Sequence, residues 1–215
     1  MAFEDNPDFV RGKRLQTATD LLDGMSLLLL AGGASRRMGR PKALLPVGGI
    51  TLAEWQVERL GGAFAETLVA TGPDSPLPTS LERLRVLDAW PGAGPLAGID
   101  AGLRAATRAW VFCLACDLPL ASLELARRLA AAAAGHQVAA PRVAGRPHPT
   151  CAVYARGAGP HLHRALESGE RRLARVVGEL DVVWLEDVDV RLLTNLNTPA
   201  DLTSLDGWPP AGERP

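Results

Sequence analysis

The chain has 215 residues and a mass of 22.7 kDa, enough for one large domain with a sizeable core. Its 23 Lys and Arg residues nearly balance its 24 Asp and Glu residues, so the overall charge gives no support to a nucleic-acid or anionic-membrane partner. No apolar stretch approaches the roughly 20 residues that span a bilayer, and an odd number of cysteines without a secretion signal predicts a cytoplasmic protein with reduced thiols.

The order of the predicted elements is that of an α/β protein. Residues 1–24 show no apolar segment of a secretory signal and are expected to form an N-terminal extension. From there, short apolar runs alternate with longer helical patterns, which predicts one domain over residues 25–205 with a mainly parallel sheet. The strand candidates are Ser26–Ala31, Thr67–Thr71, Arg85–Leu87, Trp110–Cys116, Gln137–Pro141, Thr150–Tyr154 and Val182–Leu185.

Capping residues indicate where helices begin between these strands. Thr51 followed by Glu54 makes a capping-box pattern at the head of LAEWQVERL. Ser122 opens an alanine-rich helix in the same way. Thr198 followed by proline predicts a short last helix, Thr198–Leu205, before a disordered tail at residues 206–215.

Cys113 and Cys116 spell C-x-x-C, a spacing that often marks zinc or redox sites. Here the pair lies in AWVFCLACD, which has the pattern of a buried strand. Because residues three apart on a strand point to opposite faces, the two sulfurs cannot converge on one metal. We expect both to be small residues of the core.

A glycine-rich turn follows the first strand, where open α/β sheets place their ligands. The stretch AGGASRRMGRPK fits neither G-x-G-x-x-G nor G-x-x-x-x-G-K-[ST], which disfavours a Rossmann dehydrogenase or a P-loop NTPase. Gly32 and Gly33 would let the backbone approach a phosphate, Ser35 could add a hydroxyl, and Lys42 could place a positive charge on it. The alternative is an ordinary tight turn with solvated arginines.

The full stretch LAGGASRRMGRPKALLP resembles the signature of nucleotidyltransferases that activate small phosphorylated metabolites. Five later blocks resemble one branch of them, the molybdenum cofactor guanylyltransferases. In chain order they are PGAGPLAG, ACDLPL, HPTCAVY, SGERRL and NLNTPADL, at residues 91–98, 115–120, 148–154, 168–173 and 195–202. The resemblance implies a three-layer, mostly parallel Rossmann-like sheet with helices on both faces, of the nucleotide-diphospho-sugar transferase type.

Two aspartates are expected at the carboxyl edge of this sheet. Nucleotidyl transfer gathers several phosphate charges, so Mg²⁺ bound by carboxylate oxygen is expected on physical grounds. Asp117 follows a buried strand directly, and the resemblance makes it the metal ligand; otherwise it would cap the turn before Pro119. The resemblance makes Asp88 a nucleotide contact; without it, Asp88 reads as a residue of a strand-end turn.

The resemblance implies a GTP site that draws on several segments. One family feature is missing, because Ala70 and Thr71 stand where an asparagine commonly ends the strand, and the Thr71 hydroxyl could replace it in part. The implied GTP-binding residues are Leu30, Ala31, Gly32, Gly33, Ser35, Lys42, Thr71, Asp88 and Asp117.

A second group of residues is implied for the pterin substrate. His148 lies in a region that the family uses toward the pterin, although a lone histidine is more often structural. Arg171 and Arg172 could bind an anionic phosphate, or form the solvated face of an amphipathic helix. Asn195 and Asn197 could bind substrate, or organise the turn before the last helix.

The implied reaction is transfer of GMP from GTP to the terminal phosphate of molybdenum-molybdopterin, with Lys42, Arg37 and Asp117 as catalytic residues. Proteins that insert molybdopterin, and molybdoenzymes, are the further partners considered. A cytidylyltransferase would read L-A-A-G where this chain has LAGG, and a glycosyltransferase would show D-x-D at the metal. A non-catalytic nucleotide-binding partner of molybdoenzymes is the alternative from another class.

Overall fold

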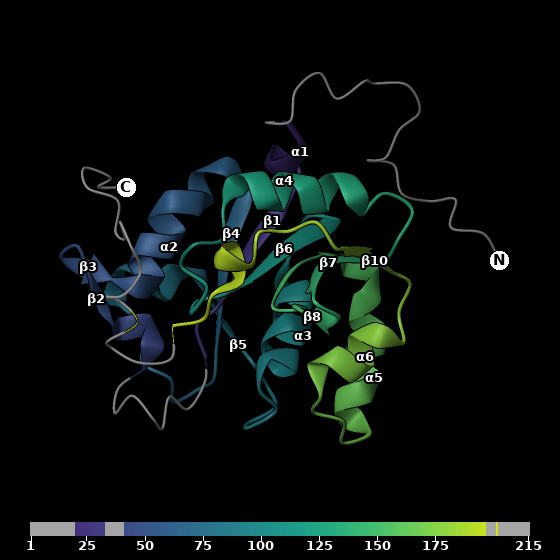
Figure 1. Ribbon diagram of the computed structural model, residues 1–215. Coiled ribbons are helices and arrows are strands. Elements are labelled where there is room, and N and C mark those ends of the chain that lie inside the picture. Colours follow the sequence, from purple (N-terminus) through teal and green to yellow (C-terminus); the bar gives the residue numbers. More distant parts are fainter. Residues whose placement is uncertain (1–19, 33–40, 197–200, 202–215) are drawn as a thin grey trace.

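The computed structural model describes residues 20–32, 41–196 and 201 (Figure 1). Within these residues eight strands form one main sheet, whose central path runs in the order β10-β7-β9-β6-β1-β4-β5, with β8 paired to β7. The strands are β1 (Ser26–Leu30), β4 (Glu66–Thr71), β5 (Arg85–Leu87), β6 (Trp110–Ala115), β7 (Val138–Val143), β8 (Arg146–Pro147), β9 (Cys151–Ala155) and β10 (Val182–Leu185).

The main path is parallel except at β9. Strand β1 pairs in parallel with β4 and β6, β4 with β5, and β7 with β10. Strand β9 pairs antiparallel with both β6 and β7. Parallel strands bring their carboxyl ends to one edge, so β1, β4, β5 and β6 all end at the same side of the sheet.

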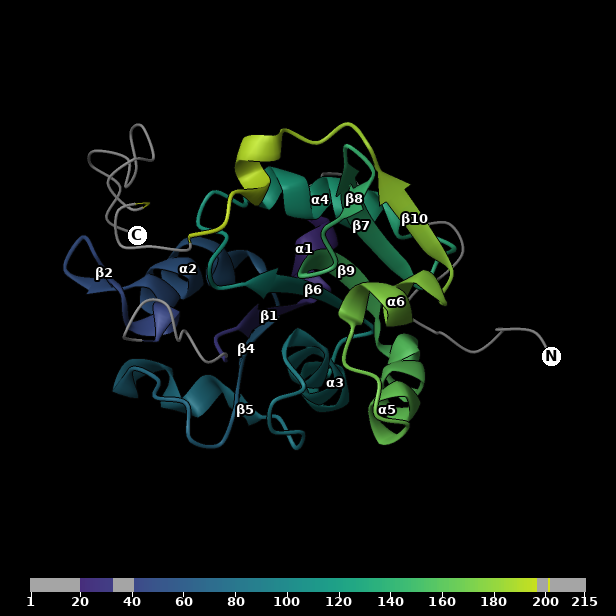
Figure 2. The ribbon, with the colours of Figure 1, turned by 60° about the horizontal axis from the view of Figure 1, so that its bottom comes forward.

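Helices cover both faces of this sheet (Figures 1 and 2). One face packs against α1, α2 and α4, and the other against α3, α5 and α6. The helices are α1 (Asp20–Asp23), α2 (Leu52–Leu60), α3 (Pro95–Ala105), α4 (Leu123–Ala132), α5 (Gly159–Glu167) and α6 (Leu173–Gly178). Short 3₁₀ turns connect them: η1 (Lys42–Leu44), η2 (Gly61–Ala63), η3 (Thr79–Leu84), η4 (Arg156–Ala158) and η5 (Val190–Leu193).

Strand β1 shows why the sheet is buried on both faces. Leu27 and Leu29 belong to the core under α2 and α4, whereas Leu28 and Leu30 belong to the core over α3. This alternation follows from the two-residue period of a strand, and the continuous leucine run is typical of a central parallel strand. The three-layer, mostly parallel fold predicted from the sequence is confirmed.

Helix α3 approaches the sheet closely because two of its residues are glycines. A Cβ atom at Gly98 would lie 3.0 Å from Leu30 Cδ2, and one at Gly102 would lie 2.8 Å from Leu28 Cγ. The absence of side chains at these positions lets α3 rest directly on β1. Its first turn is thereby held at the carboxyl edge of the sheet.

The predicted strands and the helix at Leu52–Leu60 are present, with boundaries that shift by one or two residues. The capping box of α2 is formed, because Thr51 Oγ1 accepts from the Glu54 N–H and the Glu54 carboxylate accepts from the Thr51 N–H. The small β2–β3 hairpin (Pro46–Val47 and Ile50–Thr51) and strand β8 were not predicted, because two-residue strands have no detectable periodicity.

Helix α1 lies within the predicted N-terminal extension, and its Leu22 is fully buried in the core shared with α4. The predicted tail, and the predicted last helix apart from Asp201, lie outside the described residues. None of the helices in the described ranges is long and apolar enough to span a bilayer.

Cys113 and Cys116 lie in the two different cores, on opposite faces of the sheet, as the strand geometry predicted. Both are free thiols, and burial raises the pKa of Cys113 well above its ordinary value. The C-x-x-C spacing is therefore a feature of the core.

Candidate active site

A large open cavity lies at the carboxyl edge of the sheet, with a volume of about 1090 Å³. It is bordered by the segments that follow β1, β4, β5 and β6, by η1, and by the first turn of α3. The predicted site residues on its wall are Leu30, Ala31, Gly32, Lys42, Asp88, Asp117 and Asn195. Crevices at this edge are where open α/β sheets bind ligands.

Lys42 and Asp117 form an ion pair in this cavity. Lys42 Nζ donates to Asp117 Oδ2 at 2.6 Å, and the two side chains are 22% and 24% exposed. The residues are 75 positions apart in the chain. The fold therefore brings together the cation and the carboxylate that the sequence assigned to the phosphates and the metal.

Two backbone contacts fix the turn that carries Asp117. The Cys116 N–H donates to Leu30 O at 3.1 Å, which joins the end of β6 to the end of β1. The Leu196 N–H donates to Asp117 O at 2.8 Å, so the segment containing Asn195 is held against the same turn. Asn195 is thus brought to the cavity from a segment distant in sequence.

The carboxylate of Asp117 suits Mg²⁺ better than it suits a metal that takes all of its ligands from protein side chains. The described residues contain no group of three or more His, Cys, Asp or Glu side chains that could hold a metal ion. Mg²⁺ typically binds one or two carboxylates and completes its octahedron with water and substrate phosphates. Asp117, with one carboxylate on the cavity wall, meets that requirement.

Asp88 lies on the far side of the cavity, beyond β5. Burial raises the pKa of its carboxyl group above the ordinary value of 3.8, and a hydrogen bond from the Trp90 backbone opposes this effect. Its Oδ1 atom is buried and has no hydrogen-bond partner among the described residues. A buried polar atom without a hydrogen bond costs free energy, so this oxygen is available to accept a hydrogen bond from a ligand.

Gly32 and Thr71 occupy neighbouring positions where β1 and β4 end. A Cβ atom at Gly32 would lie 3.3 Å from Gly72 N, so glycine permits the close approach of the two strand ends. Thr71 is fully buried, and its hydroxyl accepts from Arg85 Nη1 at 3.0 Å. Thr71 therefore supports the strand end from inside, and its side chain is not part of the cavity wall.

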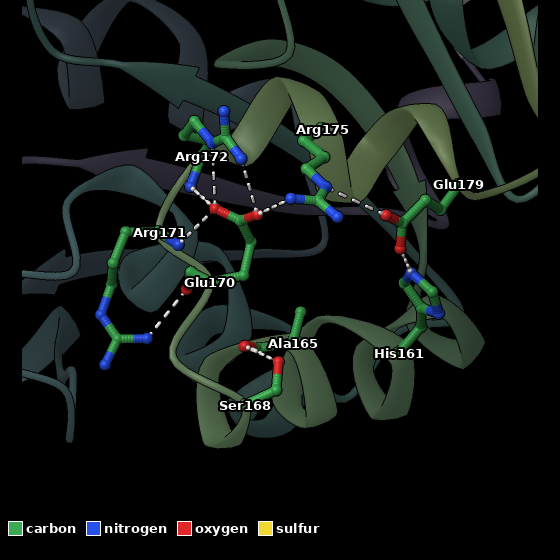
Figure 3. A network of polar contacts seen from close by, with 8 residues as sticks. All are labelled: His161, Ala165, Ser168, Glu170, Arg171, Arg172, Arg175 and Glu179. Carbon is green, nitrogen blue, oxygen red and sulfur yellow. Dashed lines mark hydrogen bonds and ion pairs between the residues drawn. The ribbon is translucent and has the colours of Figure 1, made fainter.

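The residues assigned to the pterin are spread over different places. Arg171 stacks over the Trp90 ring at 5.9 Å, next to the segment of residues 91–95 that borders the cavity. Arg172 instead lines a second hollow of about 620 Å³ between α5 and α6. Figure 3 shows Arg172 above the Glu170 carboxylate and the Arg171 side chain to its lower left, so the two side chains run in different directions.

Glu170 organises these two arginines. Its carboxylate accepts the backbone N–H groups of Arg171 and Arg172 and pairs with the guanidinium groups of Arg172 and Arg175 (Figure 3). The Arg172 backbone N–H, then its side chain, then the Arg171 backbone N–H lower the pKa of Glu170 to about 2. The SGERRL block thus contains a fixed turn at the start of α6.

His148 is half-buried on the segment between β8 and β9, and it is absent from the wall of either cavity. Desolvation, with a smaller effect of Arg146, lowers the pKa of its imidazole, so it is neutral at physiological pH. Gly33, Ser35, Arg37 and Asn197 lie outside the described residues.

Two parts of the cavity wall were not predicted. The turn after β4 contributes Gly72, Pro73, Asp74, Ser75 and Pro76. Thr150, whose carbonyl accepts from the Ala115 N–H at 2.7 Å, also borders the cavity. The run GPDSP after an apolar strand is a turn signal at the expected edge of the sheet, and it could have indicated this wall.

Comparisons with known proteins agree with this geometry. Residues 27–183 match the family described as MobA-like NTP transferase domain. The chain is 40% identical over 182 residues to a Mycobacterium tuberculosis protein named probable molybdenum cofactor guanylyltransferase, covering 81% of this chain and 90% of the relative. A Carboxydothermus hydrogenoformans protein of the same name is 32% identical over 191 residues, covering 86% and 96%.

Solved structures show the same fold. The crystal structure of molybdopterin-guanine dinucleotide biosynthesis protein A from Archaeoglobus fulgidus superposes with a TM-score of 0.70 at 28% identity, covering 84% of this chain and 96% of that one. A 2-C-methyl-D-erythritol 4-phosphate cytidylyltransferase from Thermus thermophilus follows with a TM-score of 0.63 at 24% identity, covering 82% and 95%. At that identity the second likeness concerns the fold alone.

Proposed function

Because this chain belongs to the MobA-like NTP transferase family and is an enzyme of the nucleotidyltransferase class, we propose that it transfers GMP from GTP to the terminal phosphate of molybdenum-molybdopterin. Its relatives are named for the same guanylyl transfer to the molybdenum cofactor. The observation that carries the proposal is the Lys42–Asp117 ion pair on the wall of the cavity at the carboxyl edge of the sheet.

The chemistry is an exchange of phosphoanhydride bonds. An oxygen of the pterin's terminal phosphate forms a bond to the α-phosphorus of GTP, and the bond from that phosphorus to the bridging oxygen of pyrophosphate breaks. The nucleophile is already an anion near neutral pH, so no general base is needed. The enzyme's contribution is positioning and charge stabilisation.

The chain's own residues fit these roles. Lys42 offers a compact ammonium group to the phosphates, and the ion pair with Asp117 holds it in place before the nucleotide arrives. Asp117 would hold Mg²⁺, which neutralises triphosphate charge when bound. Gly32 allows the ends of β1 and β4 to approach each other closely at the cavity wall, where the nucleotide would bind, and Asp88 accepts a hydrogen bond from the nucleotide.

The remaining assignments are also proposals. Arg37, Ser35 and Gly33 are assigned to GTP from the sequence motif, and Thr71 acts through the strand end. Asn195, Asn197, Arg171, Arg172 and His148 are assigned to the pterin; Asn195, on the cavity wall, has the strongest support. A cytoplasmic location, and contacts with molybdopterin-insertion proteins or molybdoenzymes, stay predictions.

A pyrophosphate-release assay with each nucleoside triphosphate, with and without molybdenum-loaded molybdopterin, tests the function. We expect release with GTP only when the pterin is present. Release with CTP instead would replace the guanylyl assignment by a cytidylyl one. No release with any nucleotide would favour a non-catalytic nucleotide-binding protein.

In the same assay Asp117→Ala should abolish turnover while the protein stays folded. The control is Asp181→Asn, since Asp181 is an exposed carboxylate paired with His136 away from the cavity. We expect this control to retain wild-type activity. Normal turnover of Asp117→Ala at saturating Mg²⁺ would refute the role given to Asp117.

A further inference from the structure

We propose that Gln56 and Arg59 of helix α2 are positioning residues that set the place of Asp117 relative to Lys42. Neither residue lies on the cavity wall. The inference rests on the proposed function in one respect: the proposed function gives the Lys42–Asp117 pair its role in nucleotidyl transfer. The contacts that carry it are made beneath the cavity, between α2 and the turn that follows Asp117.

The turn of residues 118–121 is held by side chains of α2. Gln56 is fully buried, and its Nε2 donates to Leu118 O at 2.9 Å. Arg59 Nη2 donates to Pro119 O at 3.0 Å and also to Ala121 O. Three backbone carbonyls of one short buried turn therefore receive donors from a single helix.

The two side chains also hold each other. Arg59 Nη2 donates to Gln56 Oε1 at 3.0 Å, and the Arg59 guanidinium stacks over the Trp55 ring at 4.5 Å. The guanidinium is thus fixed by packing as well as by hydrogen bonds. A donor group fixed in this way can hold the turn at a set distance from α2.

The same helix also supports Lys42. The Leu52 N–H at the start of α2 donates to Leu45 O at 2.7 Å, directly after η1. Ala43 and Leu45 are buried in one core with Leu52 and Ala53. Helix α2 therefore carries η1 at its first turn and the Asp117 turn further along, and its rigidity fixes the 2.6 Å distance between Lys42 and Asp117.

The alternative is that Gln56 and Arg59 only satisfy buried carbonyls and stabilise the fold. Both roles predict some loss of stability on mutation. They differ in their effect on the Lys42–Asp117 pair, so the test must observe that pair directly.

The sequence makes this possible, because its only lysines are Lys13 and Lys42. In a Lys13→Arg background, Lys42 gives the one lysine side-chain signal in an NMR spectrum. We expect that signal to be displaced from the position of a solvent-exposed lysine, and Asp117→Asn to remove the displacement. Gln56→Met keeps the volume but removes the donor, and it should move the signal most of the way toward the exposed position.

The matched control is Glu66→Gln at the opposite edge of the sheet. The Glu66 carboxylate accepts from Ser26 Oγ, Thr107 N and Arg108 N, so it also fixes a loop by hydrogen bonds. We expect this variant to lose stability and to leave the Lys42 signal unchanged. If Gln56→Met does not fold, Arg59→Lys replaces it, because the change keeps the charge and removes the planar guanidinium whose Nη2 reaches two carbonyls.

The functional consequence is measured as the Mg²⁺ concentration that gives half-maximal pyrophosphate release. Outer groups that orient a metal ligand typically alter metal affinity 10- to 100-fold. We expect an increase of about 10-fold for Gln56→Met, with turnover at saturating Mg²⁺ close to wild type, and no change for Glu66→Gln.

An unchanged Lys42 signal in the folded Gln56→Met or Arg59→Lys protein would overturn the proposal. A Lys42 signal that moves toward the exposed position in Glu66→Gln as far as it does in Gln56→Met would also overturn it. If the wild-type protein releases no pyrophosphate with any nucleotide, the proposed function fails. The NMR comparison still decides the positioning role in that case, because it requires neither metal nor turnover.

Discussion

Asp88 illustrates how a single residue of the site can lower the stability of the folded protein. Burial raises the pKa of its carboxyl group above 3.8, so the folded protein holds the proton more tightly than the unfolded chain does. The resulting penalty is absent at pH values well below 3.8 and develops as the pH rises through that range. An ionised Asp88 therefore destabilises the empty site at neutral pH.

We predict that Asp88→Asn unfolds at a higher temperature than the wild-type protein near neutral pH and that the difference disappears in acid. Thermal unfolding from about pH 3 to about pH 8 measures this. The control is Asp74→Asn, an exposed carboxylate of the same cavity, which should show no such gain. A wild-type protein as stable as Asp88→Asn at neutral pH would contradict the prediction. Weaker GTP binding by the more stable variant would mark Asp88 as retained for function.

Asp117 and Asp88 could be placed at the site from the sequence because each follows an apolar run that predicts a sheet strand, and parallel strands share a carboxyl edge. Their roles, and that of Lys42, came from the resemblance to the nucleotidyltransferase motifs. The distance between Lys42 and Asp117, and the burial of the Thr71 hydroxyl behind the strand end, required the packed structure. The hydrogen bond from Gln56 to the turn after Asp117 could not be predicted either, because a single glutamine in a helix matches no sequence motif.

Among the elements, long apolar runs predicted the strands because β1, β4 and β6 are buried on both faces and admit few polar residues. The separation of Arg171, which lies over the Trp90 ring, from Arg172, which lines the hollow between α5 and α6, was not predictable. The directions of the two side chains depend on the turn at Glu170, which the sequence pattern does not define. The packing of α3 on β1 was not predictable either. It depends on two glycines of α3 that face β1, and the sequence does not show which residues of a helix will face the sheet so closely.

That packing gives a prediction for α3. A Cβ atom at Gly102 would lie 2.8 Å from Leu28 Cγ and closer to its methyl groups. Alanine favours a helix over glycine by about 1 kcal/mol, but overpacking a core costs typically about 1–3 kcal/mol and sometimes more. We expect Gly102→Ala to lower the free energy of unfolding, measured in urea. Stability equal to wild type would contradict the prediction and would show that the Leu28 side chain adopts another rotamer without cost.

Gly178→Ala at the end of α6 is the matched control. Apart from its chain neighbours and its own helix backbone, no atom of the residues that the structure describes lies within 4 Å of a Cβ at that position, and its φ is outside the positive range. The substitution should be neutral or stabilise by about 0.4–1 kcal/mol, because alanine reduces the entropy of the unfolded chain.

For the whole molecule, the strand order decides which segments a ligand can join. Strands β6, β1, β4 and β5 are consecutive neighbours, and adjacent strands lie about 4.8 Å apart. The cavity crosses the ends of all four, from Asp117 after β6 to Asp88 after β5. A nucleotide bound along this edge would therefore touch segments from both halves of the chain and stabilise the fold as a unit.

We predict that GTP with Mg²⁺ raises the unfolding temperature of the whole protein in one transition. At a ligand concentration 100 times the dissociation constant, binding contributes about 2.7 kcal/mol. For a chain of this size each kcal/mol corresponds to about 2–4 °C, so the expected increase is about 5–11 °C. Differential scanning fluorimetry with and without Mg²⁺ measures it. Asp117→Asn should keep a smaller shift that no longer depends on Mg²⁺, because the lost carboxylate is the one assigned to the metal. A Mg²⁺-dependent shift of wild-type size in that variant would place the metal elsewhere.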